Sequence, residues 1–277
     1  MKTQTLFALL TCFVLAPLSE VVVPGVFAQE PEAGDYIRTE AVRPEIEKMT
    51  TALREVRMGQ RNMDDLLKTY AARTADPKRS KRERAIAWFV QGRLLTALGR
   101  GEDAARAWRT SLELYSRFPD AHVHLGGTKL IARNVKGARK YAKAALAIHR
   151  QHVKALVLLG RIAESEAELE KAIRFYLQAY SFDQGSSHIL MGLASNYARL
   201  YKQSFNAERK SAHASRARGV VDAWVEMEPN LVRARLFQAH IFKSLDDAKT
   251  DFEIGNDAGR NSGSLSGWAF AVPRDDL

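Results

Sequence analysis

The chain has 277 residues, of which 46% are hydrophobic and 27% are charged, a balance that fits a globular protein of one large or two small domains. Its net charge of +10 favours acidic partners such as anionic polysaccharides, lipid head groups or acidic proteins. Cys12 is the only cysteine. Downstream of it, a disulfide scaffold, a thiolate metal site and a cysteine nucleophile are therefore excluded.

Residues 1–28 have the pattern of a secretory signal peptide. Lys2 precedes an apolar run over residues 6–15, and the short residues Val26 and Ala28 suit signal peptidase. We therefore expect cleavage after Ala28 and an exported protein, either periplasmic or extracellular. Export separates the chain from cytoplasmic DNA and RNA, so no nucleic-acid partner is expected.

Two other interpretations of this leader stay open. The first is an uncleaved membrane anchor, although Glu20 and Pro24 interrupt the segment before it reaches the ~20 apolar residues that a membrane span needs. The second is a lipoprotein signal at Cys12, for which Thr11 is a poor preceding residue.

The stretch before the first clear repeat is expected to start as a flexible linker over residues 29–43. Residues 44–76 then show apolar residues at helical spacing from Ile46 to Tyr70. This stretch does not follow the 34-residue period of the repeats described below, and it predicts an N-terminal capping helix or a helical hairpin.

Glycine and alanine return with a period of 34 residues in the middle of the chain. A glycine inside a helix costs roughly 1 kcal/mol relative to alanine, so its return at a fixed interval calls for a packing reason. Two antiparallel helices can cross closely only where side chains are small, and we interpret these positions as packing positions rather than ligand-binding ones. They are Gly92, Gly126 and Gly160, each followed twelve residues later by Ala104, Ala138 and Ala172.

This pattern resembles the tetratricopeptide repeat (TPR), with Trp108 and Tyr176 at the aromatic position of the first and third units. Gln91, in place of a leucine, and Ala142, in place of an aromatic residue, depart from the family pattern. The resemblance implies an all-α fold, a right-handed α-solenoid of antiparallel helix pairs. The solenoid is expected over residues 85–250, with units at 85–118, 119–152, 153–184 and 185–230 and a cap at 231–250.

The fourth unit is longer than the others. Gly192 and Ala217 are 25 residues apart where the clear units have 12, which predicts an insertion or a lengthened hairpin within about residues 200–213. Residues 251–277 are rich in Gly, Ser and Asn and are expected to form a disordered tail. Trp268 and Phe270 in this tail form a candidate docking motif.

In TPR proteins the first helices of successive units line a concave groove that receives a peptide or a helix. Carried over to this chain, the groove is apolar and lacks the lysine and asparagine set that clamps a terminal carboxylate in chaperone-binding relatives. Either a protein partner binds there, or the N-terminal helix or the tail of the chain already fills it. The predicted groove residues are Phe89, Val90, Arg93, Val123, His124, Ile131, Val157, Leu158, Arg161, Ile189, Leu190 and Leu193.

Two clusters of cations stand out as a second kind of candidate site. They are interpreted either as docking patches for an anionic polymer or lipid surface, or as a solvated linker and helix surface. The first includes Lys78, Arg79, Lys81 and Arg82, and the second Lys136, Arg139, Lys140 and Lys143.

No pattern of catalytic or cofactor-binding residues is present in the sequence. His122 and His124 point about 200° apart on a helix and cannot share a metal ion, whereas His149 and His152 flank a turn without a nearby carboxylate or thiolate. No metal, no cofactor and no enzymatic activity are therefore expected. The sequence favours a non-enzymatic protein-binding scaffold or adaptor in a bacterial-type cell envelope, with anionic-polymer or membrane-surface binding as the alternative.

Overall fold

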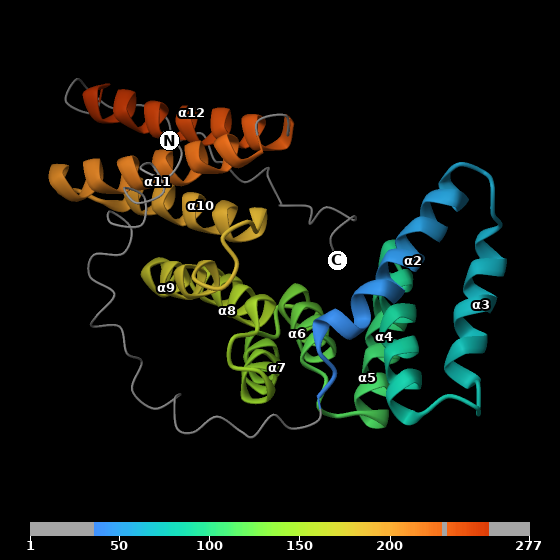
Figure 1. Ribbon diagram of the computed structural model, residues 1–277. Helices are drawn as coiled ribbons and strands as arrows, with labels where there is room; N and C mark the ends of the chain where they lie inside the picture. The colour runs from blue at the N-terminus through green and yellow to red at the C-terminus, as the bar shows by residue number, and fades with distance from the viewer. Residues whose placement is uncertain (1–35, 229–231, 255–277) are drawn as a thin grey trace, which may run out of the picture. The chain divides into compact units, whose positions relative to one another are not determined.

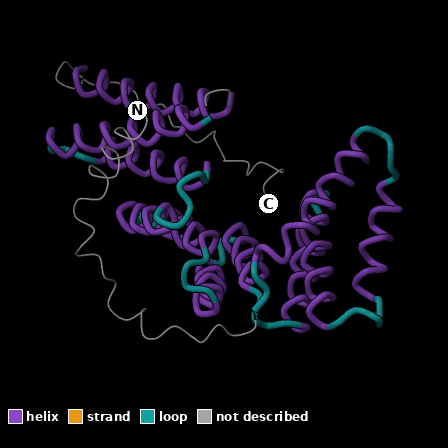
Figure 2. Tube along the Cα trace, in the orientation of Figure 1, coloured by secondary structure: helices purple, strands orange, loops and turns teal. Residues whose placement is uncertain are grey.

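The computed structural model describes residues 36–228 and 232–254, whose helices are drawn in Figure 1. Every regular element of this described part is an α-helix, and Figure 2 shows no strand in it. The all-α class expected from the sequence is confirmed. The described chain divides into two compact units, residues 36–165 and 166–254, and the division falls inside the predicted third repeat.

A helical hairpin precedes the repeats. It consists of α2 (Thr39–Arg57) and α3 (Met63–Ala75). Gly59, in the turn between them, has φ of 73°, which glycine reaches without strain. Asn62 then caps α3 by accepting a hydrogen bond from the backbone N–H of Asp64 at 2.7 Å. Of the two forms predicted for residues 44–76, the hairpin is therefore the one observed.

The linker prediction is wrong at its C-terminal end. Helix α2 begins at Thr39, so residues 39–43 are helical and Pro44 lies inside the helix. A proline usually marks the first turn of a helix, and for that reason the sequence places Pro44 near the start. Tertiary contacts override this preference, because Ile37 and Val42 are fully buried and fix the chain before the proline.

The first unit continues with two complete repeat hairpins and one further helix. The hairpins are α4 (Lys81–Ala97) with α5 (Gly101–Leu114), and α6 (Pro119–Ile131) with α7 (Val135–Ile148), followed by α8 (Val153–Ser165). Local sequence sets several of these starts. Ser80 and Glu83 form a capping box before α4, Pro119 stands in the first turn of α6, and Asn134 caps α7.

Gly92 lies against the indole ring of Trp108. A Cβ atom added at Gly92 would be 2.3 Å from Nε1 and 2.6 Å from Cδ1 of that ring, which is far inside van der Waals contact. The indole N–H donates to the carbonyl oxygen of Phe89 at 3.1 Å, so the ring has a fixed place between α4 and α5. The glycine therefore makes room for the aromatic residue of its own hairpin.

Two later glycines meet equally close neighbours. A Cβ at Gly126 would lie 2.6 Å from Cδ2 of Leu158 and 3.3 Å from the carbonyl oxygen of Ala138. At Gly192 it would lie 2.5 Å from Cζ of Tyr176. The packing role predicted for the repeat glycines is confirmed at these positions, with one correction. The space left by the glycine is filled mainly by a neighbouring side chain rather than by a second backbone.

The remaining repeat positions are buried as expected. Gly160 is buried in α8. Ala104, Ala138 and Ala172 each have 0% of their surface exposed, which leaves no room for a larger side chain at the crossing of two helices.

The second unit contains four helices: α9 (Leu169–Tyr180), α10 (Ser187–Gln203), α11 (Ala207–Met227) and α12 (Val232–Ile254). The fourth repeat is a lengthened hairpin, because α10 and α11 are both long helices and only a short turn joins them. Trp224 is fully buried, packs against Phe237 with ring centroids 5.7 Å apart, and thereby joins α11 to α12. Helix α12 includes residues 251–254, and the rest of the expected tail, residues 255–277, lies outside the described residues.

The neighbouring glycines of α6 provide a test of this packing. Gly126→Ala should lower the free energy of unfolding by about 1–3 kcal/mol, because the new methyl group collides with Cδ2 of Leu158 and is held tightly against the Ala138 carbonyl. Gly127 has no atom within 4 Å of an added Cβ. Gly127→Ala should therefore raise the stability by up to about 1 kcal/mol through helix propensity.

Urea unfolding of both variants followed by circular dichroism measures the difference. Equal effects of the two substitutions would contradict the packing assigned to Gly126.

Candidate functional site

The residues predicted to line a groove fall into three classes of exposure. Seven are buried and cannot contact a partner in this structure, namely Phe89, Val90, Arg93, Leu158, Ile189, Leu190 and Leu193. Val123, His124, Val157 and Arg161 are half-buried, and Ile131 is 70% exposed. The prediction of an open apolar groove therefore needs correction, because most of its aliphatic residues belong to the core.

The N-terminal segment packs against the first repeat. Phe89 belongs to one core cluster with Ile37, Val42 and Met49. The backbone N–H of Ile37 donates to the carbonyl oxygen of Arg117 at 3.0 Å, directly before α6. Near the first repeat, the chain therefore occupies its own surface, which is one of the two alternatives that the sequence left open.

A buried carboxylate anchors this segment. Asp120, 2% exposed, accepts a hydrogen bond from the hydroxyl of Thr39 at 2.7 Å and another from the ammonium of Lys154 at 3.0 Å. Nε2 of His152 lies 3.8 Å from the same carboxylate, at ion-pair distance. Three helices, α2, α6 and α8, thus meet at one charged group.

The electrostatics of Asp120 follow from these partners. Burial by itself raises the pKa of the carboxyl group, because the charged form loses its hydration. The imidazole of His152, the positive charge of Lys154 and the hydroxyl of Thr39 outweigh burial and hold the pKa of Asp120 well below its usual value. The carboxylate is therefore ionised at neutral pH.

His124 supports the same region as an uncharged ring. His124 lies between Phe89 and Trp108, with ring centroids 5.1 and 4.8 Å away. Burial lowers the pKa of His124 well below its usual value, and the charge of Arg93 lowers it further. At neutral pH His124 is therefore a neutral packing residue between α4, α5 and α6.

A strip of the first unit remains uncovered on α6 and α8. Val123 and Val157 hold equivalent repeat positions, as do Gly127 and Arg161, and each pair is 34 residues apart. The two valines and Arg161 are half-buried, and the space beside Gly127 is open. We call these four residues the inner strip. It contains two apolar side chains, one glycine with open space beside it, and one positively charged side chain.

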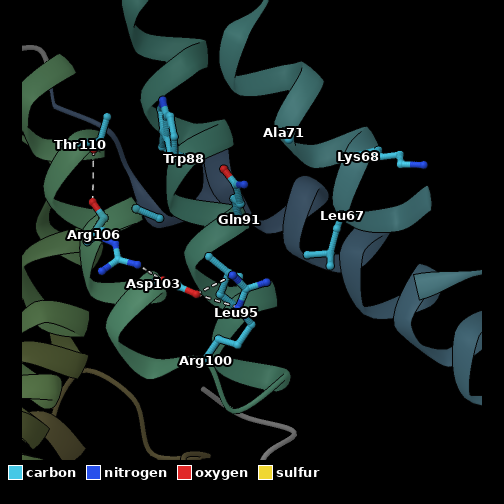
Figure 3. A pocket seen from close by; sticks show the side chains of 11 residues that line it. Leu67, Lys68, Ala71, Trp88, Gln91, Leu95, Arg100, Asp103, Arg106 and Thr110 are labelled. Carbon is cyan, nitrogen blue, oxygen red and sulfur yellow. Dashed lines mark hydrogen bonds and ion pairs between the residues drawn. The ribbon is translucent and has the colours of Figure 1, made fainter. Parts of the chain in front are cut away.

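A hollow of about 570 Å³ lies between α3, α4 and α5, as Figure 3 shows. Its apolar walls come from Leu67, Ala71, Trp88, Leu95 and Ala107. At its edge Asp103 binds both Arg100, at 2.7 Å, and Arg106. The hydrogen bond from Arg100 and the charges of the two arginines lower the pKa of Asp103.

The two basic clusters differ in their surroundings. Around residue 80, Arg79 pairs with Asp76 at 3.5 Å and Glu83 caps the helix, so part of the first cluster serves the start of α4. Lys136, Lys140 and Lys143 are exposed on α7, a helix that contains no acidic residue.

The rings of His149 and His152 lie 5.7 Å apart at their centroids, and His149 also stacks on Tyr36. Within the described residues, no group of three or more His, Cys, Asp or Glu side chains is placed to hold a metal ion. None of the described helices is both long enough and apolar enough to cross a membrane. The predicted signal peptide, residues 1–28, lies outside the described residues.

These features define an α-helical repeat protein whose hairpins present a partly self-occupied face. Solved structures with TM-scores above 0.5 share the fold. A TPR protein of Thermus thermophilus, TTC0263, is 15% identical and has a TM-score of 0.55, covering 71% of this chain and 98% of its own. PilF of Pseudomonas aeruginosa is 16% identical with a TM-score of 0.51, covering 78% and 91%.

A tetratricopeptide repeat protein from Parabacteroides merdae is 11% identical with a TM-score of 0.51, covering 79% of this chain and 82% of its own. No family model matches the sequence, and no curated protein does. The fold of this chain is that of the tetratricopeptide repeat.

Sequence reasoning missed the residues that anchor the N-terminal segment. Thr39 and Asp120 are 81 positions apart, and no local pattern links them. One signal was available, since Asp120 and Lys154 hold equivalent positions of successive repeats and carry opposite charges. Gly127 escaped notice because its role depends on the empty space beside it.

The buried carboxylate of Asp120 predicts how the stability of the fold changes at acid pH. Because the folded-state pKa of Asp120 is depressed, its contribution to stability is present above the ordinary aspartate pKa of about 3.9 and decreases as the pH falls below that value. Asp120→Asn should lower the free energy of unfolding at pH 7 by about 1–3 kcal/mol.

The difference between wild type and Asp120→Asn should shrink between about pH 4 and pH 2. Denaturant unfolding over this range measures it. A difference that stays constant down to pH 2 would show that the carboxylate charge does not stabilise the fold.

Proposed function

We propose that the protein is an exported, non-enzymatic scaffold or adaptor of the cell envelope that holds a protein partner as a peptide or helix. The TPR fold supports an interaction module. The leader pattern of residues 1–28 supports export, with periplasmic or extracellular location after cleavage at Ala28. A peptide or helix is favoured as the partner of the uncovered surface on α6 and α8, because this surface is an open strip.

The inner strip is the observation on which this proposal rests. Val123 and Val157 keep part of their side chains uncovered on two helices that pack together, α6 and α8. Gly127 leaves space between them and the end of α6, where Ile131 is 70% exposed. An amphipathic segment laid along this strip buries its apolar side chains there, and Arg161 provides a charge for an acidic residue of the partner.

The N-terminal segment limits where such a partner can lie. Ile37 and Thr39 already occupy the edge of the surface next to Asp120. A partner therefore contacts the inner strip beyond this edge, unless it replaces the segment.

Blocking the open space at Gly127 tests the proposal. Gly127→Trp should keep the fold and reduce capture of the partner roughly tenfold, because an indole fills the space that the ligand needs. Gly219→Trp is the matched control, since Gly219 also lies within a helix and has no atom within 4 Å of an added Cβ. Cross-linking of tagged protein in its native envelope, followed by mass spectrometry of attached proteins, provides the measurement.

The expected result is a set of proteins lost with Gly127→Trp and retained with Gly219→Trp. Equal recovery from both variants, or no attached protein with wild type, would refute the proposed surface.

The second cluster of cations supports one alternative function, attachment to an anionic polymer or membrane surface. Lys136, Lys140 and Lys143 recur at i, i+4 and i+7 on α7, exposed and without an acidic neighbour in that helix. Such an attraction is screened by salt, because the Debye length is about 8 Å at physiological ionic strength.

For this alternative, vesicles containing anionic lipid should bind the protein at low salt and release it at high salt. Lys140→Glu with Lys143→Glu should abolish binding, whereas the same charge change at two exposed cations of α10, Arg199 and Lys202, should not. Cosedimentation measures both. Binding that ignores salt, or an equal loss in both double variants, would rule the α7 surface out.

A further inference from the structure

Position 91 breaks the repeat pattern at a place that the fold uses for packing. The equivalent residues of the next two repeats are Leu125 and Leu159, which are 2% and 5% exposed. The first repeat has Gln91 instead, and it is only half-buried. At this position the second and third repeats have a leucine buried in the core. In the first repeat the position is held by Gln91, which borders the hollow between α3, α4 and α5.

The buried end of Gln91 lacks a partner. Its Oε1 atom has no contact with solvent and accepts no hydrogen bond within the described residues. Figure 3 shows Gln91 among the residues that line the hollow, next to Trp88.

The other residues that line the hollow indicate which kind of side chain it can hold. Leu67, Ala71, Leu95 and the half-buried Trp88 offer an apolar surface that includes an aromatic ring, which suits an aromatic side chain. At about 570 Å³, the hollow lies within the range of about 300–1,000 Å³ typical of ligand pockets.

The edge of the hollow is positively charged. Lys68, Arg100 and Arg106 border it together with a single acidic residue, Asp103, which already binds both arginines. The occupant that fits therefore combines an aromatic residue and a nearby carboxylate.

We propose that the occupant is residues 264–277 of this chain, SLSGWAFAVPRDDL, which lie outside the described residues. This segment contains two aromatic residues, Trp268 and Phe270, followed by two carboxylates, Asp275 and Asp276. An aromatic ring of the segment enters the hollow against Trp88, and its aspartates face the cations at the edge. Trp268 lies fourteen residues beyond the end of α12, a length that spans at most ~50 Å.

This docking goes beyond the proposed function and does not depend on it. The hollow lies between α3, α4 and α5, whereas the inner strip lies on α6 and α8. A partner on the inner strip and the tail in the hollow are therefore separate interactions with separate tests.

Photocross-linking in the full chain tests the proposal. Trp268 is replaced by the photoreactive residue p-benzoylphenylalanine, and the protein is irradiated, digested and mapped by mass spectrometry. The expected result is a cross-link within one chain to peptides from α3, α4 or α5 that line the hollow. Cross-links to other helices, covalent dimers, or no cross-link would overturn the assignment of the tail as occupant.

Two neighbouring alanines of α3 provide a matched pair of variants. Ala71 lines the hollow and Ala72 does not, and both are exposed, so a large side chain at either position leaves the core intact. Ala71→Trp fills the hollow and should reduce the cross-link yield roughly tenfold, while Ala72→Trp should leave it unchanged. Equal yields from the two variants would contradict docking in the hollow.

A charge exchange gives an independent readout. Lys68→Glu with Arg106→Glu reverses the sign of the net charge at the edge and should weaken the cross-link, and adding Asp275→Lys with Asp276→Lys should restore it, because the attraction at the edge is reformed with opposite signs. Thermal unfolding by circular dichroism confirms that each variant folds. Failure of the exchange to restore the cross-link would exclude the aspartates as the charged contact.

Discussion

The close fit between a helical glycine and the side chain that lies over it is the constraint on which the structure depends. Trp108 occupies the space of the missing side chain at Gly92, donates to the Phe89 carbonyl, and contacts His124 on the next repeat. One residue therefore joins α4, α5 and α6. The positions of Phe89 and His124, and with them the start of the inner strip, follow from this contact.

The side chain that lies over the glycine differs from one repeat to another. Tyr176 fills the space at Gly192 in the second unit, as Trp108 does at Gly92. The second repeat has Ala142 at the aromatic position, and there Leu158 lies over Gly126 instead. The glycine is thus the fixed part of the arrangement, and the side chain that covers it is exchangeable, provided that the volume is filled.

A second, polar constraint decides which part of the surface stays available. Asp120 binds Thr39 and Lys154, and this buried charge holds the N-terminal segment against the first and second repeats. A buried carboxylate is stable only with such partners, since an ionised group loses its hydration on burial. The anchor therefore has a structural cost and also a consequence for the surface, because it covers the edge of the first unit next to Asp120.

Much of the fold could be predicted from the sequence because the repeat is local. Glycine and alanine spacing located the helical hairpins, and the wide interval before Ala217 indicated the long hairpin of α10 and α11. Contacts between distant residues could not be predicted. The contact of Thr39 with Asp120 and the start of α2 ahead of Pro44 both depend on where the N-terminal segment lies.

The hollow could not be predicted from the sequence either, because distant parts of the chain form it. Gln91 was visible as a departure from the repeat, but its meaning depends on the distance between α3 and α5.

A double-mutant cycle between Gly92 and Trp108 tests the central constraint most directly. Gly92→Ala forces a methyl group into the indole ring, whereas in the Trp108→Leu background the smaller side chain leaves room for it. The destabilisation by Gly92→Ala should therefore be smaller in that background by at least about 1 kcal/mol, measured by urea unfolding. Additive effects of the two substitutions would show that the glycine is not there to accommodate the ring, and the account of the repeat packing would be wrong.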